Sequence, residues 1–212
     1  MMGSFRFGLE FFERLEKVDG AIAAAVAAGG CRHCQGPLHW GNYLRKPRGG
    51  LIAGGGEGSR VRHSLCCGRR GCRKRCLPPS LRFFGRRVYL EAVVVWASVM
   101  ALLRRCLGEA AESAGVPLRT LRRWASWWRN IFPATATWSE LRGRFVPPVP
   151  EESELPLSLL QRLESTCESG GARDPTCEAM VLAARHLGPL TTASVTDATR
   201  FVRAGFWVGG AE

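Results

Sequence analysis

Six of the nine cysteines lie between positions 31 and 76, and their spacing is typical of metal ligation. Cys31 and Cys34 are three positions apart, so their two thiolates can turn inward onto one tetrahedral ion. A compact second group follows in the stretch CCGRRGCRKRC, over residues 66–76. A site closed by four thiolates leaves no open position for a substrate, so the pattern predicts one structural zinc ion rather than a catalytic metal.

Spacing alone leaves the second pair of ligands open. In the stretch RVRHSLCC, strand alternation places Cys67 and Cys66 on opposite faces, so only one of them can easily face the metal. Two glycines suit a tight turn between Cys67 and Cys72, and we therefore favour these two as ligands. Cys66 with Cys72 is the second choice, because a shift of one residue in strand register would exchange the adjacent cysteines. Cys76 is the third, since it lies past a very basic stretch. The alternative to a metal site is two unrelated groups of free thiols.

The positive charge of the chain gathers around the cysteines. The net charge is +12, and the segment from Gly30 to Asn130 holds 20 Arg or Lys against four acidic residues. A basic centre with more acidic flanks is typical of proteins that bind a phosphate backbone. The alternative is a basic surface that only keeps the chain soluble. Five basic residues adjoin the cysteines, and we expect them to contact phosphates: Arg69, Arg70, Arg73, Lys74 and Arg75.

Residues 107–130 fit the pattern of a helix-turn-helix. Gly115 occupies the turn, where a positive φ is needed, and Pro117 suits the start of the second helix. The apolar residues of that second helix fall on one face, so the opposite face is left to solvent or to a ligand. The alternative is an ordinary amphipathic pair of helices. The polar face is predicted to enter the major groove of DNA with Arg119, Thr120, Arg122, Arg123 and Ser126.

The elements that must position these residues define a mainly α fold with a small β zinc ribbon. A chain of 212 residues can form one good core or several small modules. We expect an N-terminal helix, the ribbon, a long apolar helix over residues 87–106, the helix-turn-helix and short C-terminal helices. The predicted domains are an N-terminal helical segment (1–30), a ribbon-like module (31–86), a helical domain (87–145), a Pro-rich linker (146–154) and a C-terminal helical region (155–212).

The sequence predicts a cytoplasmic, nucleoid-associated protein without a membrane partner. The apolar stretch over 88–103 is short for a membrane span and contains Glu91, so we expect a buried helix there. The residues before the first apolar run are rich in acids, where a secretory signal peptide carries positive charge. Clustered cysteines in such a chain are typical of metal ligation in a reducing compartment.

The order of the motifs resembles the N-terminal region of bacterial insertion-sequence transposases. The shared features are a CxxC, a second cysteine pair, the stretch CRKR, the segment PPSLRFFGRRVYLEAVVVW and a helix-turn-helix containing RTLRRW. The resemblance covers roughly residues 31–130, and it extends to small proteins encoded within mobile elements of GC-rich bacteria. It implies a zinc ribbon and a helix-turn-helix that binds element ends.

One large departure from those transposases concerns catalysis. A nuclease domain with three metal-binding carboxylates follows their DNA-binding region, whereas Asp174 and Asp197 are the only aspartates after Asn130 here. We therefore expect no enzymatic activity, and the resemblance then implies an accessory or regulatory protein of a mobile element, or a truncated remnant. Its expected partners are duplex DNA and a second copy of the chain or a recombinase.

Two other functions fit the same features. Zinc ribbons with basic stretches also occur in RNA-binding proteins. A zinc-dependent protein–protein adaptor would use its positive charge to meet an acidic partner. The Arg-rich face of the second helix favours DNA binding over the adaptor.

Overall fold

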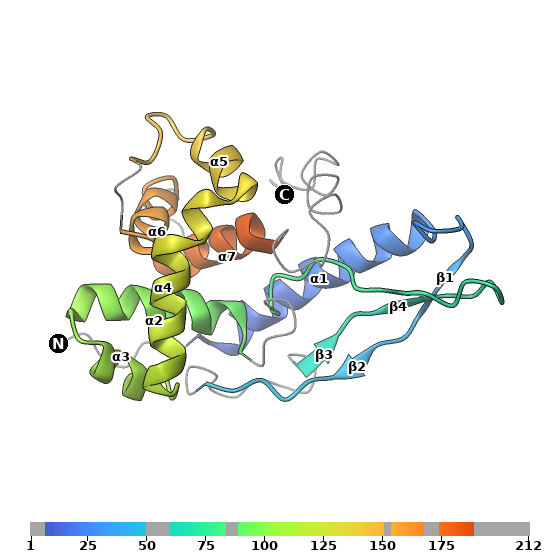
Figure 1. Ribbon diagram of the computed structural model, residues 1–212, viewed down its shortest axis with the longest axis horizontal. Coiled ribbons are helices and arrows are strands. Elements are labelled where there is room, and N and C mark those ends of the chain that lie inside the picture. The colour runs from blue at the N-terminus through green and yellow to red at the C-terminus, as the bar shows by residue number, and fades with distance from the viewer. Residues whose placement is uncertain (1–6, 50–59, 84–88, 151–153, 168–173, 189–212) are drawn as a thin grey trace.

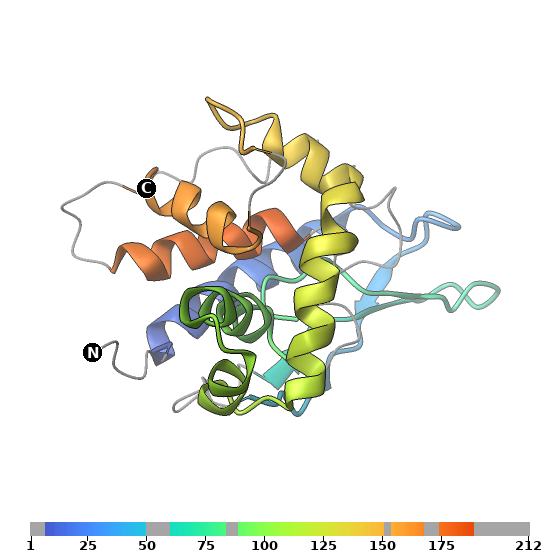
Figure 2. The same ribbon diagram turned by 60° about the vertical axis from the view of Figure 1, so that its left-hand side comes forward.

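The computed structural model describes residues 7–49, 60–83, 89–150, 154–167 and 174–188. This part of the chain is mainly helical with small antiparallel sheets, which confirms the predicted fold class in outline. Figure 1 shows a body of helices from which a thin arm of strands projects, and the same arm stands out in Figure 2. The helices are α1 (Leu9–Ala28), α2 (Glu91–Arg104), α3 (Leu107–Ser113), α4 (Leu118–Asn130), the 3₁₀ turn η2 (Phe132–Ala134), α5 (Ala136–Arg142), α6 (Leu157–Glu164) and α7 (Pro175–Leu187).

α1 runs from the body along the arm (Figure 1). Phe12, Leu15 and Ile22 recur at helical spacing and are buried, so one face of α1 joins the core. The helices that follow the Pro-rich segment pack into the same core, and α6 and α7 contribute their buried residues to it. Arg14 of α1 also donates two hydrogen bonds to the carboxylate of Glu178 in α7, at 2.5 and 3.0 Å. α1 and α7 are therefore packed together.

The apolar helix α2 is shorter than the sequence predicts. We expected helix over residues 87–106, but α2 spans Glu91–Arg104. Tyr89 and Leu90 are extended because each forms an isolated β-bridge with an earlier segment, and Arg105 ends the helix in a left-handed conformation with φ of 50°. Residues 89–90 and 105–106 are thus not helical as predicted, whereas residues 87 and 88 lie outside the described part. Among the described residues, no helix is long and apolar enough to cross a membrane.

Short antiparallel strands form the arm. A three-stranded sheet has the order β1-β4-β5, and β2 pairs with β3 in a second sheet. The stretch RVRHSLCC, which alternation predicts to be one strand, is divided between the two sheets at His63 and Ser64. The strands are β1 (Leu38–Trp40), β2 (Tyr43–Leu44), β3 (Val61–Arg62), β4 (Leu65–Cys67) and β5 (Arg75–Cys76).

A buried charge network joins the arm to α1. The carboxylate of Asp19, which is 1% exposed, accepts hydrogen bonds from Ser80 Oγ (2.6 Å), the backbone N–H of Leu81 (2.5 Å) and Arg82 Nε (2.9 Å). The Arg82 guanidinium also donates to the carbonyl of Val61 at 2.9 Å. A buried charge is stable only when it is paired and hydrogen-bonded. This network therefore fixes the segment that follows β5 to α1.

The predicted C-terminal helical region is described in part. α6 and α7 lie within the predicted range of 155–212. Residues 168–173 and 189–212, together with 1–6, 50–59, 84–88 and 151–153 elsewhere in the chain, lie outside the described part.

Candidate metal centre and nucleic-acid interface

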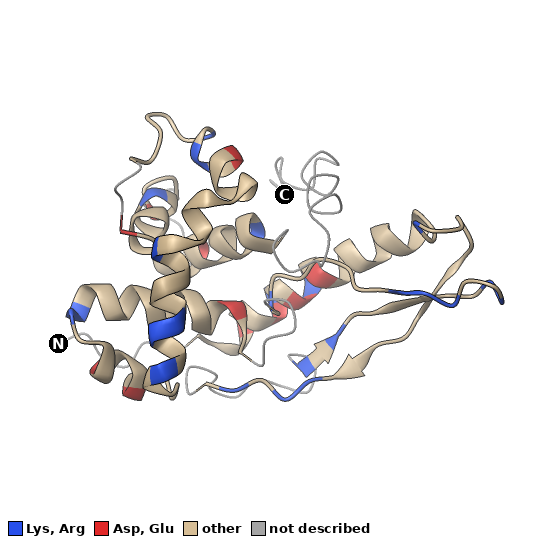
Figure 3. Ribbon diagram, in the orientation of Figure 1, with Lys and Arg blue, Asp and Glu red and all other residues tan. Residues whose placement is uncertain are grey.

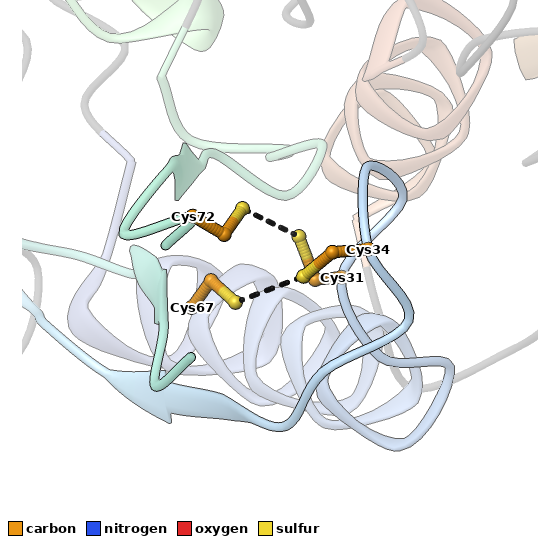
Figure 4. A group of neighbouring side chains, drawn as sticks. All are labelled: Cys31, Cys34, Cys67 and Cys72. Carbon is orange, nitrogen blue, oxygen red and sulfur yellow. Dashed lines mark hydrogen bonds between the residues drawn. The ribbon is translucent and has the colours of Figure 1, made fainter. Parts of the chain in front are cut away.

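The four favoured cysteines lie together in the arm, with their side chains pointing toward one another (Figure 4). Cys31 and Cys34 follow the end of α1, Cys67 is the last residue of β4, and Cys72 lies in the turn between β4 and β5. Their sulfur atoms all lie within 4.8 Å of one another. Residues separated by more than thirty positions in the sequence thus form one cluster that is compatible with a single metal ion.

The sulfur spacing fits tetrahedral coordination. Cys31 Sγ lies 3.7 Å from Cys72 Sγ, and Cys34 Sγ lies 3.5 Å from Cys67 Sγ. A tetrahedral ion with metal–sulfur bonds of about 2.3 Å separates its ligands by about 3.8 Å. The cluster therefore needs only small side-chain adjustments to close on one ion.

The two halves of the cluster share one backbone pattern. Each sulfur accepts a hydrogen bond from the backbone N–H two residues ahead in the chain. The residues at positions 35 and 73, which follow the second cysteine of each half, have positive φ values of 57° and 48°. This conformation turns the backbone around the sulfurs so that its N–H groups point at them, and such oriented N–H groups stabilise thiolates. The donor residues are His33, Gly36, Arg69 and Lys74.

Gly36 is required by close packing beside the sulfurs. A Cβ atom at this position would lie 3.3 Å from Cys34 Sγ, 3.4 Å from Cys67 Sγ and 3.2 Å from Arg69 Cβ. A side chain at this position would therefore force the sulfurs or Arg69 to shift by a few tenths of an ångström. The cysteine spacing gives no sign of this requirement, although a glycine two positions after a CxxC is a signal that could have revealed it.

The four thiols do not hold their protons equally. Hydrogen bonding from the backbone N–H of His33 lowers the pKa of the Cys31 thiol to about 7. The N–H of Arg69 favours the thiolate of Cys67, but burial and the neighbouring sulfurs outweigh that contact and raise its pKa to about 12. Like charges at this spacing cannot all persist without a cation. A bound dication would hold all four sulfurs as thiolates, so metal binding must release protons.

Cys66 and Cys76 lie outside the cluster. Cys66 Sγ lies 3.6 Å from the carbonyl of Arg73, on the opposite face of β4 from Cys67. Cys76 pairs with Leu65 across the sheet, one strand away from the sulfurs of the cluster. Strand alternation thus separates Cys66 from Cys67 as the sequence predicts.

The predicted helix-turn-helix segment forms two helices joined by a tight turn. α3 is followed by Gly115, which has a φ of 60°, and the N–H of Val116 donates to the carbonyl of Ala111 at 2.9 Å. In α4, Leu121, Trp124 and Trp128 are buried in the core. The face of α4 opposite to these residues is consequently turned to solvent.

The residues predicted to contact DNA lie almost entirely on the surface. Arg119, Arg122, Arg123 and Ser126 on α4 are exposed, whereas Thr120 is half-buried. The five basic residues of the arm, Arg69, Arg70, Arg73, Lys74 and Arg75, are also exposed. Figure 3 shows Lys and Arg both on α4 and along the arm.

Some of these basic side chains also stabilise the arm. Arg69 Nη1 donates to the carbonyl of Cys34 at 3.0 Å and so connects the two halves of the cysteine cluster. The Arg75 guanidinium lies 5.9 Å from the centre of the Tyr43 ring, within the range of a cation–π contact. Arg69 and Arg75 therefore make contacts within the arm itself.

A third basic segment, which the sequence interpretation missed, connects the arm to the helices. Lys46 and Arg48 are exposed, and Arg48 forms a β-bridge with Tyr89 just before α2. The next residue, Gly49, packs against Val93 of α2 and the carbonyl of Ala114, at the turn before α4. Local charge density around positions 45–48 was the available signal in the sequence.

No protein-family model matches this sequence, and neither a curated protein nor a solved structure does.

Proposed function

We propose that this chain is a sequence-selective DNA-binding protein whose arm is held by one structural zinc ion. The observation that carries the proposal is the exposed face of α4, where Arg119, Arg122 and Arg123 lie opposite the buried Leu121 and Trp124. A helix presented in this way after a tight turn can enter the major groove, and Arg is the usual partner of guanine.

Zinc is the ion that we propose for the cysteine cluster. Four thiolates are soft ligands in a tetrahedral arrangement, which favours zinc over calcium or magnesium. The ion would have no open coordination position, so its role is to fold the arm and to aim the basic turn between β4 and β5. In this proposal the turn binds phosphates and α4 reads bases.

The basic segment at residues 45–48 extends this interface. It follows β2 in the arm and ends beside the turn that precedes α4. Its exposed Lys46 and Arg48 would add phosphate contacts between the arm and the recognition helix. DNA bound along this path would contact both modules of the chain.

We infer an accessory role in a mobile element, without strand transfer by the chain itself. The resemblance of residues 31–130 to the N-terminal region of insertion-sequence transposases supports this inference. A second copy of the chain or a separate recombinase would then supply the catalytic partner, and the protein would act at the nucleoid.

Fluorescence anisotropy with labelled duplex DNA tests the proposal directly. Duplexes selected by the protein from a randomised pool should bind at least about 1,000-fold more tightly than random duplex. Affinity for both should fall steeply with salt, by about 10³-fold or more between 50 and 200 mM if six phosphates are contacted. Affinity that is independent of salt, or a pool that yields no preferred sequence, would refute DNA reading by this chain.

Matched variants separate the two modules. Arg122→Ala should lower affinity for the selected duplex by about tenfold or more and relax its sequence preference. Lys74→Ala should weaken selected and random duplexes alike and reduce the salt slope by about one. Arg104→Ala, at an exposed position at the end of α2, is the control and should change little. Equal losses on both duplexes for Arg122→Ala would contradict the role assigned to α4.

RNA binding is the second candidate, favoured by exposed aromatic rings on the arm. Trp40 is 52% and Tyr43 36% exposed, and the Arg75 guanidinium lies beside the Tyr43 ring. Unstacked bases of RNA loops pack on such rings. Competition between the selected duplex and a structured RNA of equal length distinguishes the two, because tighter RNA binding that Trp40→Ala abolishes would favour this function over the first.

A further inference from the structure

Two residues from opposite halves of the cysteine cluster are held in contact with each other. The backbone N–H of His33 donates to the sulfur of Cys31. In the other half, the backbone N–H of Lys74 donates to the sulfur of Cys72. His33 and Lys74 therefore hold equivalent places, each two positions after a cysteine. Their side chains meet, with Lys74 Nζ lying 3.4 Å from His33 Nδ1.

The other nitrogen of the same ring contacts a second cation. Arg32 Nε donates to His33 Nε2 at 3.3 Å, while Lys74 lies at Nδ1. A neutral imidazole accepts at one nitrogen and donates at the other, so His33 cannot accept from both cations. A guanidinium and an ammonium each carry several N–H donors, and an anion placed between them would accept from both.

This group of side chains is accessible and strongly positive. Arg32, His33 and Lys74 are all exposed, so a ligand reaches them directly from solvent. The exposed Arg69 adds a further charge, and its guanidinium is held by a 3.0 Å hydrogen bond to a backbone carbonyl of the other half. Glu57 is the only acidic residue between positions 31 and 76. Within this segment the positive charge is therefore barely offset, which favours an anionic ligand.

We propose that Arg32, His33 and Lys74 form one binding site for a phosphate group, and that the metal assembles this site. The inference rests on the proposed function, because it takes the phosphate from a nucleic acid. It adds that neither half of the cluster holds the phosphate alone, since Arg32 and His33 belong to one half and Lys74 to the other. The phosphate is either an internal diester of a strand or the monoester at a strand end, and both present oxygens that accept from these donors.

The metal matters to this site because it fixes the distance between the two halves. The strands around the cluster are only two or three residues long, so they hold the halves weakly by themselves. A site whose donors are already in place binds its ligand more tightly than one that must be ordered on binding. Phosphate affinity should therefore rise with metal occupancy.

Fluorescence anisotropy of the zinc-loaded full chain with random duplex DNA, over a range of salt, tests whether these residues share one phosphate. Arg32→Gln and Lys74→Gln should each weaken binding severalfold and lower the salt slope by up to about one. Because both remove donors from the same phosphate, the double variant should bind little worse than either single variant. Arg104→Gln, at an exposed position of the body, is the matched control and should change little. Additive losses, or an effect of Arg32→Gln no larger than that of the control, would overturn the proposal.

Duplexes that differ only at their ends identify the source of the phosphate. If the ligand is a terminal monoester, duplexes with 5′-phosphates should bind more tightly than duplexes with 5′-hydroxyls, and Arg32→Gln should abolish the difference. If the ligand is an internal diester, both duplexes should bind alike, and Arg32→Gln should weaken both equally. A preference for phosphorylated ends that survives Arg32→Gln would place the phosphate elsewhere and refute this site.

NMR titration of the full chain with inorganic phosphate, at constant ionic strength and with chloride as the control, separates this inference from the proposed function. With zinc bound, the backbone N–H signals of residues 32, 33 and 74 should shift with phosphate and not with chloride. The shifts should be lost in Arg32→Gln and after chelation. If they occur in a chain that binds no duplex, the site stands and DNA binding fails. If duplex binds but these signals do not respond to phosphate, or respond equally after chelation, this inference alone is wrong.

Elemental analysis of the variants keeps the comparison decisive. Arg32 is exposed and its side chain does not contact the sulfurs in the described contacts, so Arg32→Gln should retain one zinc ion per chain. If it does not, Lys74→Gln with its zinc retained carries the same titration with phosphate.

Discussion

The arm and the helical body are stable for different physical reasons. The strands of the arm are two or three residues long, and β1 and β2 leave Trp40, Tyr43 and Leu44 exposed. The body buries a continuous apolar core that includes residues from every described α-helix. Strands this short cannot form a stable sheet in water without further support. From this comparison we expect the arm to depend on a metal bound by its cysteine cluster, and the body to fold on burial alone.

The largest expected effect is that of metal removal. Structural zinc contributes about 10 kcal/mol or more to the folding of small modules, so chelation should unfold the arm and leave the body folded. Amide hydrogen exchange with and without chelator measures this. Protection should disappear from residues 31–40 and 65–76 and persist in α2 and α4. Loss of protection in both regions together would show that they form one cooperative unit.

Truncation of a core side chain should destabilise the body and leave the arm folded. Phe132 is 0% exposed and packs against Trp127, Trp128 and Trp138, so Phe132→Ala should destabilise the body by about 4 kcal/mol. Chemical denaturation measures the stability of the body. Zinc affinity reports on the arm, and this affinity should change little. Ile131→Ala, at a 55% exposed neighbour, is the matched control and should change stability by less than about 0.5 kcal/mol.

The connection between the two regions can be broken at Asp19. Asp19→Asn removes the charge that pairs with the buried Arg82 and should destabilise the protein by about 3 kcal/mol. Hydrogen exchange should show the loss at residues 80–83 and along α1. Glu13→Gln, at an exposed position of the same helix, should have little effect. If Asp19→Asn leaves the stability unchanged, the arm is held to α1 without this network.

A smaller loss of stability in the body should appear as the pH falls. Burial, and secondarily the nearby Arg144 and Arg185, lowers the pKa of His186 in α7 to about 4. The unfolded chain binds this proton at about pH 6.5, so its contribution to stability is lost as the pH falls from about 6.5 to 4. The loss is on the order of 1 kcal/mol, because the ring is half-buried and solvent screens its charge.

Denaturation of the metal-free chain across this pH range measures the stability of the body alone. In the metal-bound chain, acid would also release the metal from the arm. His186→Gln should lose less stability than the natural chain between pH 6.5 and 4. An identical pH dependence of the two proteins would exclude His186 as the cause.

The grouping of the four cysteines and the helix pair could be predicted because each depends on local rules. The two-residue period of a strand separates Cys66 from Cys67, and the pattern of apolar residues places Trp124 and Trp128 in the core of α4. Gly115 has the positive φ that its place in the turn predicts. Rules of this kind need no knowledge of the rest of the fold.

The remaining features depend on contacts between distant segments. The Asp19–Arg82 pair spans 63 positions, and Arg69 reaches the carbonyl of Cys34 over 35. The length of α2 was mispredicted because bridges formed by Tyr89 and Leu90 override the helical preference of an apolar run.

Zinc stoichiometry is the most direct test of the account, since the metal-held arm underlies both the comparison and the proposed function. Elemental analysis and native mass spectrometry should give one zinc ion per chain. Cys67→Ser should lose the ion, whereas Cys66→Ser, one residue away on the other face of β4, should retain it. A chain without zinc, or zinc that is retained by Cys67→Ser and lost by Cys66→Ser, would contradict the account.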